Sequence, residues 1–460
     1  MDWEIVEERL LNLLNNGKHS ELRGALMMLN EVDIARFMES LDKEKLLLTF
    51  RILPKDISAD VFAYMSAEQK QTLIESIGDN EIRSLIEDMF LDDTVDFLEE
   101  LPANVVKRVL QNTSESKRNL INQFLRYPDN SAGSLMTIEY MELKRGMTVQ
   151  EAMAAIRRTG LDKETIYTLY IIDQARHLIG TIALRSLILA DDDVLIDTLM
   201  DTSIISVKTM DDQEKVAETV REYDLMTIPV VDNENRLVGI ITADDVMDVI
   251  EDENTEDFEK MAALTPSEEE YLKMTPWQLA LNRIPWLLVM AVIAIFTGLI
   301  ITHYEDVLQT TGSVGIILTS CIPMLMDTGG NCGAQSSTLI IRGLSLGEIT
   351  LKDFFRVLWK EFRVAIIVGA ALFVFTLLRV KYVNAVLMGT DIKWSVAAVV
   401  ASALFFTIML AKALGCIMPM LAKKLKLDPA LMASPLITTM VDMASLVVYF
   451  SIATSVLHTV

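Results

Sequence analysis

The 460-residue chain contains only three cysteines and four histidines. Cys321, Cys332 and Cys416 all lie in the C-terminal half, and their spacing is typical of neither a disulfide framework nor a zinc site. The histidines are scattered along the chain and form no candidate metal cluster. The sequence also lacks a nucleophile–base pair, a phosphate-binding loop and a metal-hydrolase motif. We therefore predict that the protein is not an enzyme.

Basic residues are scarce in the first 270 positions, which carry 27 Lys or Arg side chains against 56 Asp or Glu. Residues 271–460 reverse this balance, with fourteen basic and nine acidic side chains. The split predicts an acidic soluble region followed by a membrane domain. An acidic region excludes nucleic acid as a partner and attracts cations, although solubility accounts for part of the excess. The chain begins Met-Asp-Trp-Glu, without a basic segment and apolar run, so we expect no cleaved signal peptide.

Residues 1–127 contain helix breaks at a constant step of twelve residues. The breaks fall at Asp42, Pro54, Ser66, Gly78, Phe90, Pro102 and Ser114. Between them, apolar residues follow helical spacing. Because helices this short are not stable alone, we expect them to stack into a small superhelix. An acidic helical-repeat domain of this kind indicates a scaffold or a regulatory module.

A second repeat follows, with every matched position displaced by 59 residues. Residues 170–173 and 178–182 match residues 229–232 and 237–241, and each copy predicts a strand, a polar turn, a strand and a helix. The pair resembles tandem cystathionine-β-synthase-type (CBS) domains, here 128–199 and 200–250. The resemblance implies an intracellular regulatory module of a kind that often binds adenine nucleotides, which makes ATP a candidate ligand.

Residues 251–280 are rich in carboxylates and predict an acidic connecting helix that leads to Trp277 and Trp286, two aromatic anchors at a membrane surface. Residues 281–460 contain five apolar segments that suit the roughly 20-residue requirement for a membrane span. They lie at about 284–302, 312–328, 362–380, 394–421 and 430–457. The predicted fold class is therefore multidomain, α plus α/β: a helical superhelix N domain, tandem CBS domains, a connecting helix and a five-helix transmembrane domain.

The loops between these spans carry unequal basic charge. The loops on the side of the N-terminal domains hold eight Lys or Arg residues, and the opposite loops hold three. This bias predicts a cytoplasmic N-terminus and an outside C-terminus. Since five spans are an odd number for one chain to enclose a pore, we expect a homodimer with the conduit on or near its axis.

Two features of the membrane half are candidates for ion binding. Asp442 lies in the middle of the fifth span, where an unpaired charge costs several kcal/mol. Gly329, Gly330 and Asn331 form a polar stretch at membrane depth, so their backbone oxygens are expected to face protein or a water-filled path. Each feature has a structural alternative, which is an ion pair with Lys412 for Asp442 and close helix packing for the glycines.

Two Asp442 carboxylates brought together by dimer symmetry would favour a divalent cation over potassium. Mg²⁺ requires octahedral oxygen ligands and loses its water reluctantly, so a pore would hold it through water molecules. Residues 328–343 (Thr328-Gly329-Gly330-Asn331-x-Gly333-x-Gln335-Ser336-x-Thr338-Leu-Ile-Ile-Arg342-Gly343) then resemble the pore signature of the MgtE family of magnesium channels. Residues 428–436 and Asp442 match the final span of that family. Asp327, a carboxylate directly before the two glycines, departs from its pattern.

The resemblance covers the whole chain and implies a homodimeric, Mg²⁺-selective channel of the plasma membrane, which intracellular Mg²⁺ closes by binding between acidic domain faces. It carries a metal-sensor role onto eleven carboxylates. These are Asp60, Asp92 and Asp96 in the N domain; Asp212, Glu214, Asp224, Asp245 and Asp248 in the second CBS domain; and Glu253, Glu256 and Asp257 in the connecting ("plug") helix. For any one of them, a solvated surface carboxylate is an equal alternative.

We therefore predict magnesium uptake through a channel with its own cytosolic Mg²⁺ sensor, in which binding to the closed state shifts the population towards it. The lipid bilayer, divalent cations and a second copy of the chain are the expected partners. The alternative is a secondary transporter that exchanges Mg²⁺ or another divalent cation for Na⁺ or H⁺. In that case Lys412 and Asp442 would form a titrating pair.

Overall fold

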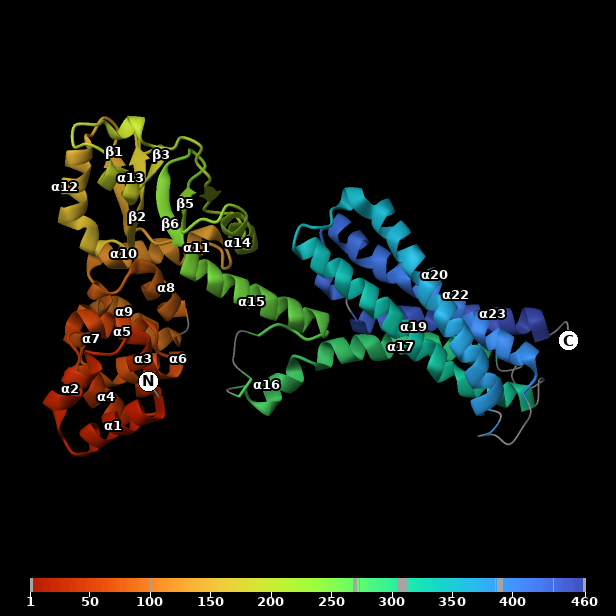
Figure 1. Ribbon diagram of the computed structural model, residues 1–460. Coiled ribbons are helices and arrows are strands. Elements are labelled where there is room, and N and C mark those ends of the chain that lie inside the picture. The colour runs from red at the N-terminus through yellow and green to blue at the C-terminus, as the bar shows by residue number, and fades with distance from the viewer. Residues whose placement is uncertain are drawn as a thin grey trace. The chain divides into compact units, whose positions relative to one another are not determined.

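The computed structural model describes residues 3–99, 101–267, 271–272, 274–304, 313–384, 386, 392–432 and 434–457. The chain divides into two compact units, Met1–Ile250 and Glu251–Val460. Figure 1 shows their helices and strands.

The first unit begins with a stack of short helices. They are α1 (Trp3–Asn15), α2 (His19–Leu26), α3 (Glu31–Glu39), α4 (Lys43–Ile52), α5 (Lys55–Ala63), α6 (Ala67–Ser76), α7 (Asp79–Asp88), α8 (Leu91–Glu99), α9 (Ala103–Asn112) and α10 (Glu115–Phe124). From α4 to α10 every helix begins twelve residues after the one before it, directly behind the breaks that the sequence predicts. Asp42 and Ser114 act as N-caps, because their side chains accept hydrogen bonds from the first-turn amides of Lys45 and Lys117.

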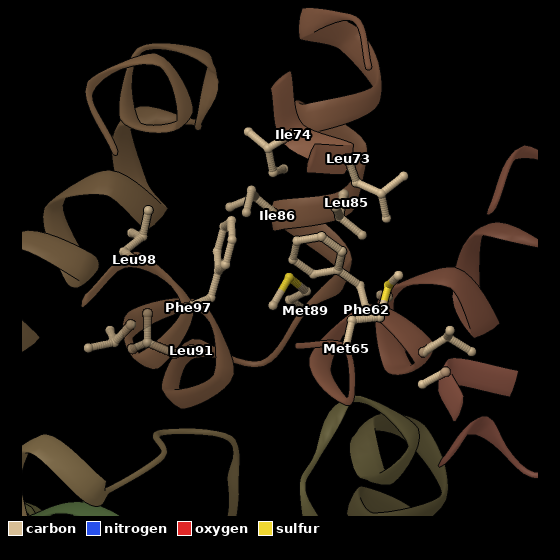
Figure 2. Packing of buried hydrophobic residues seen from close by; sticks show 14 of the residues in the cluster. Phe62, Met65, Leu73, Ile74, Leu85, Ile86, Met89, Leu91, Phe97 and Leu98 are labelled. Carbon is tan, nitrogen blue, oxygen red and sulfur yellow. The ribbon is translucent and has the colours of Figure 1, made fainter. Parts of the chain in front are cut away.

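Apolar residues that recur with this period build one core along the stack. Phe62 and Phe97 are fully buried and meet edge to face, with ring centroids 4.9 Å apart. Figure 2 shows these rings among Leu73, Ile86 and Met89. Each short helix therefore gains its stability from its neighbours rather than from its own sequence.

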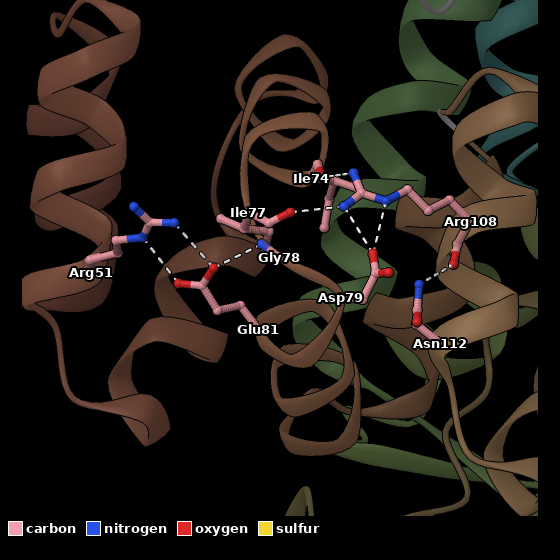
Figure 3. A network of polar contacts seen from close by, with 8 residues as sticks. All are labelled: Arg51, Ile74, Ile77, Gly78, Asp79, Glu81, Arg108 and Asn112. Carbon is pink, nitrogen blue, oxygen red and sulfur yellow. Dashed lines mark hydrogen bonds and ion pairs between the residues drawn. The ribbon is translucent and has the colours of Figure 1, made fainter.

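Ion pairs join helices that are about thirty residues apart. Arg51 on α4 donates two hydrogen bonds to Glu81 on α7, at 3.0 and 3.2 Å, and Glu81 also accepts from the amide of Gly78. Arg108 on α9 caps the end of α6 by donating to the carbonyls of Ile74 and Ile77, and it also binds Asp79 (Figure 3). These contacts fix how successive helices stack.

Two small sheets follow the helical stack, in the order β1-β2-β3 and β4-β5-β6. In each sheet the first two strands are parallel and the last two are antiparallel. The two sheets are thus copies of one arrangement, as expected for tandem CBS domains. Their elements are α11 (Ala132–Leu135), β1 (Tyr140–Lys144), α12 (Val149–Thr159), η1 (Gly160–Asp162), β2 (Thr165–Ile172), β3 (Leu178–Ala183), α13 (Leu184–Leu189), η2 (Ile196–Thr198), β4 (Val207–Lys208), α14 (Gln213–Glu222), β5 (Thr227–Val231), β6 (Leu237–Thr242) and α15 (Ala243–Met261).

The second unit contains long apolar helices, and α22 packs against α19, α20 and α23. A shared core forms around Leu318, Leu404 and Tyr449, whose hydroxyl donates to the carbonyl of Leu318 at 2.9 Å. The described elements are α16 (Pro276–Leu281), α17 (Ile284–His303), α19 (Ser313–Ser345), η3 (Leu351–Asp353), α20 (Phe354–Leu378), the π-helical turn η4 (Arg379–Asn384), α22 (Trp394–Lys424), η5 (Pro429–Met432) and α23 (Ser434–Leu457).

Within the described residues, four segments are long and apolar enough to cross a membrane: Pro276–His303, Leu351–Val383, Trp394–Lys424 and Pro429–Val456. They contain four of the five predicted spans. The remaining predicted span is the second along the chain, at 312–328. Its described part belongs to α19, whose 33 residues would be about 50 Å long. Thr328, Asn331 and Gln335 dilute the apolar character of α19. The count of five spans therefore stays a prediction.

Candidate ion-binding sites

The first unit gathers carboxylates where the helical stack meets the CBS pair. We call Asp92, Asp93, Asp96, Glu139, Glu164, Asp244 and Asp245 the acidic cluster, because they repel one another electrostatically. Three lie on α8, two lie just before β1 and β2, and two lie in the first turn of α15 (Figure 1). The amide of Glu164 donates to the carbonyl of Glu139 at 2.8 Å, which ties the two CBS strands together at this point.

Burial, together with repulsion between the carboxylates, raises the pKa values of several members of the acidic cluster. Partial burial, followed by repulsion from Glu99 and Asp93, raises the pKa of Asp96 to about 7. Burial and repulsion from Asp93 raise the pKa of Glu164 to about 7. Burial raises the pKa of Asp245 to about 6, although the hydroxyl of Thr242 donates to its carboxylate at 2.6 Å. A bound cation would relieve this repulsion.

Two lysines supply only part of the countercharge that the cluster needs. Lys70 is 8% exposed and attracts Asp93 and Asp96. Lys117 donates to the carbonyl of Met89 at 2.6 Å, and its burial lowers its pKa. In the part of the chain that the structure describes, no three His, Cys, Asp or Glu side chains form a ready-made metal cage.

The structure places the predicted sensor residues in three groups. Asp92, Asp96 and Asp245 belong to the acidic cluster, and Asp60 on α5 lies at its margin, near enough to repel Asp93. The second group is exposed: Asp212 lies directly before α14 and caps it by accepting from the amide of Glu214, which lies in the first turn, and Asp224 lies in the loop after α14. Asp248 is exposed on α15.

Sequence reasoning did not single out Asp93, Glu139, Glu164 and Asp244. Two of them stand next to predicted ligands, in the pairs Asp92-Asp93 and Asp244-Asp245, and these doublets were a usable signal. Glu139 and Glu164 precede strands in a different domain, and the sequence contains no pattern that connects them with α8.

The C-terminal half of α15 holds the third group of predicted ligands, Glu253, Glu256 and Asp257. Lys260 binds Glu256 at 2.7 Å and Asp428 at 2.8 Å, so its ammonium stands between two carboxylates. Burial, followed by repulsion from Asp428, raises the pKa of Asp257. Met261 packs beside Ile341 and Ala430, which continues this contact towards α19 and η5.

Asp442 lies on α23, partly buried within the membrane half. Its Oδ1 atom is fully buried and has no hydrogen-bond partner among the described residues, and the same holds for the Oγ1 atom of Thr407. Asp327 is close enough to repel Asp442. A buried carboxylate oxygen without a donor needs a water molecule or a cation beside it.

The glycines of the predicted pore stretch lie within α19, which is helical throughout. A Cβ on Gly329 would lie 2.7 Å from Cγ2 of Thr407, and one on Gly330 would lie 2.7 Å from Cγ2 of Thr438. This geometry corresponds to close helix packing, the structural alternative. Whether their backbone oxygens also contact an ion stays a prediction.

Asn331 differs from the two buried glycines, because its side chain is exposed. Asp327, Asn331 and Gln335 are exposed and follow one another at intervals of one turn, and the amide of Asn331 donates to Asp327 at 3.2 Å. We call these three residues the polar stripe. A polar stripe on a helix inside a membrane domain must face protein or water rather than lipid.

The structural alternative for Asp442, an ion pair with Lys412, is wrong, because Lys412 binds other residues. Its ammonium binds Ser336 on α19 at 2.9 Å and Glu361 on α20 at 3.4 Å. Glu361 lies two turns inside α20, whereas the sequence placed it just before a span.

Comparison with protein families gives three matches along the chain. A family described as the MgtE intracellular N domain matches residues 29–130, and the CBS domain family matches residues 196–252. A family described as a divalent cation transporter matches residues 322–452, which include the polar stripe and Asp442.

Curated relatives match over the full length. A magnesium transporter MgtE of Bacillus subtilis is 32% identical over 458 residues, which cover 100% of this chain and 99% of the relative. A magnesium transporter MgtE of Thermus thermophilus is 33% identical over 463 residues, covering 99% of this chain and 100% of the relative.

Two solved structures resemble the first half of the chain. The soluble part of a magnesium transporter has a TM-score of 0.53 and 33% identity, covering 55% of this chain and 99% of that structure. The cytosolic domain of the Mg²⁺ channel MgtE, in complex with ATP, has a TM-score of 0.50 and 34% identity, covering 53% and 99%.

Proposed function

The chain belongs to the MgtE family of magnesium transporters, and we propose that it acts as a homodimeric Mg²⁺-selective channel that cytosolic Mg²⁺ closes. The protein is a membrane transporter and not an enzyme. The channel mechanism, the dimer, the gating and five spans with an outside C-terminus make up the proposal.

The observation that carries the channel is the unpartnered carboxylate oxygen of Asp442. It lies on a helix that packs closely against α19, and Asp327 of the polar stripe on α19 is near enough to repel it. A two-fold axis near these residues would bring two Asp442 carboxylates to one passage. Two like charges at short range favour a divalent cation, and side-chain oxygens of the stripe suit its outer water shell.

The proposed gate uses the acidic cluster. In the absence of Mg²⁺ its carboxylates repel one another across the boundary between α8 and the CBS pair. Mg²⁺ bound there would stabilise the docked arrangement and shift the population towards the closed state. Other predicted ligands would bind Mg²⁺ at surfaces outside the acidic cluster as the assembly closes. They are Asp212, Glu214, Asp224, Asp248 and Glu253.

A continuous set of contacts supports coupling from α15 to α19. Lys260 binds Asp428, which precedes η5, and the carbonyl of Met432 at the end of η5 accepts a hydrogen bond from Ser337 of α19 at 2.7 Å. A displacement of the end of α15 would therefore act on the helix that carries the polar stripe.

ATP at the CBS pair is a further part of the proposal. It is supported by the tandem CBS arrangement and by the similar cytosolic domain that was crystallised with ATP. ATP binding would be measured by calorimetry on the full chain with and without Mg²⁺, and absence of binding in both conditions would remove this part.

The test of the channel is passive Mg²⁺ flux into proteoliposomes that have no Na⁺ or H⁺ gradient. We expect flux in the parent protein and a loss of about tenfold or more in Asp442→Ala, because the variant lacks the charge that offsets dehydration. The matched control is Glu348→Ala, which removes an exposed carboxylate of the same half outside the polar stripe. Flux that appears only with a Na⁺ or H⁺ gradient would support the exchanger instead.

A further inference from the structure

The membrane half contains a buried ion pair that the proposed ion path does not use. Lys412 on α22 and Glu361 on α20 are joined at 3.4 Å, with side-chain exposures of only 7% and 13%. Ser336 on α19 completes the group, since its hydroxyl accepts from Lys412 at 2.9 Å and donates to Glu361 at 2.7 Å. We call these residues the three-helix triad, because one hydrogen-bonded group joins α19, α20 and α22.

Stability does not explain why these positions are charged. Burying an ammonium and a carboxylate carries a large desolvation cost, and apolar residues of similar volume are often as stabilising or more so. Helices in a membrane lack a hydrophobic force that would hold them together, so their association depends on close packing and on hydrogen bonds between helices. Directional hydrogen bonds from the buried pair therefore add to packing in fixing the rotation of α19.

The triad acts on α19 where its backbone touches α22. A Cβ on Gly415 would lie 2.3 Å from the carbonyl oxygen of Gly333, so the two helices meet there without side chains between them. Ser336 follows Gln335 directly, and neighbouring residues on a helix point about 100° apart. Holding Ser336 against Lys412 therefore also fixes the direction of Gln335 and of the polar stripe.

We propose that Lys412 and Glu361 are positioning residues for magnesium transport, which hold Ser336 and thereby turn the polar stripe of α19 towards the permeating cation. The inference rests on the proposed function, in which α19 lines the ion path. Because the pair is neutral as a whole, it orients α19 without adding a carboxylate that would compete with Asp442 for the ion.

The test compares three variants with the parent in proteoliposomes. The double variant Lys412→Met with Glu361→Leu removes both charges, so it leaves no buried ion without its partner and is expected to keep the parent's melting temperature and oligomeric state. Its Mg²⁺ flux is expected to fall about tenfold, because the stripe is free to rotate. Ser336→Ala, which leaves the ion pair in place, is expected to lower the flux in the same direction.

Cys416→Ala is the matched control, since it removes a buried side chain one turn further along α22. It is expected to conduct like the parent. Parental flux in a folded double variant, or in Ser336→Ala, would overturn the inference. A parent that transports only with an ion gradient would contradict the channel instead, and the same comparison would then be made on gradient-driven transport.

Discussion

Asp442 and Lys412 illustrate what a sequence can say about single residues in a membrane. A carboxylate in the middle of an apolar segment is visible from spacing alone, and the structure places Asp442 within α23, with one oxygen unpartnered among the described residues. The pairing of Lys412 with Glu361 was not visible in the sequence. Glu361 lies on α20, which begins at Phe354, earlier than the span predicted from about residue 362. Pairing between helices depends on their rotation, which the sequence does not contain.

Acidic pH should stabilise the metal-free first unit. The pKa of Asp96, about 7, lies above its ordinary value of 3.8, so folding favours the protonated form. Stability from this shift is fully present below pH 4 and is lost as the pH rises through 7. The melting temperature of the metal-free chain should therefore fall between pH 5 and pH 8. Mg²⁺ at pH 8 should restore it by binding the folded state, and no such recovery would contradict a cation site.

Glu164 should contribute to Mg²⁺ sensing although it was not identified from the sequence. Glu164→Gln removes one charge from the acidic cluster, so closure should require a several-fold higher Mg²⁺ concentration. The measurement is flux against Mg²⁺ on the side of the N-terminal domains. Glu218→Gln, at an exposed position on α14, is the control. Equal Mg²⁺ dependence in both variants would exclude Glu164 from the sensor.

At the scale of elements, periodic patterns were the reliable guide. The step of twelve predicted where α4 to α10 begin, since each break supplies a cap or an extended residue before the next helix. The polar, glycine-rich stretch at Gly329 and Gly330 predicted backbone oxygens that face protein or a water-filled path, and the structure has an unbroken helix there, packed on α22 and α23. Glycine is typical both of accessible backbone oxygens and of close helix packing, and only the positions of the neighbouring helices distinguish the two.

Gly415→Ala should destabilise the membrane half. The new Cβ would meet the backbone oxygen of Gly333 at 2.3 Å, and backbone cannot move aside as a side chain can. Overpacking of this kind costs about 1–3 kcal/mol. Gly298→Ala on α17 has open space around the added atom and should have no such cost. Thermal unfolding in detergent compares them, and equal melting temperatures would contradict the packing.

At the scale of the whole molecule, α15 connects the two units, since it begins within the CBS pair and ends at Met261 in the second unit. The composition of the chain already separates an acidic half from an apolar half. The ion pair of Lys260 with Asp428 was not predictable, because Asp428 follows 168 residues later, in the loop between α22 and η5.

Lys260→Asp should weaken the link between the sensor and the ion path. The variant replaces an attraction to Asp428 by repulsion, so the end of α15 loses its contact with η5. Flux should then depend less steeply on cytosolic Mg²⁺. Adding Asp428→Lys restores opposite charges and should recover the dependence. A double variant no better than the single one would mean that the pair does not transmit the signal.

The central claim, a passive Mg²⁺ path closed by Mg²⁺ at the acidic cluster, is tested most directly by channel recording in a planar bilayer. Mg²⁺ on the side of the N-terminal domains is raised in steps, without Na⁺ or H⁺ gradients. We predict Mg²⁺ currents whose open probability falls as Mg²⁺ rises, and a variant with Asp92, Asp96 and Asp245 changed to Asn that stays open. Absence of passive current, or closure unchanged in that variant, would contradict the account.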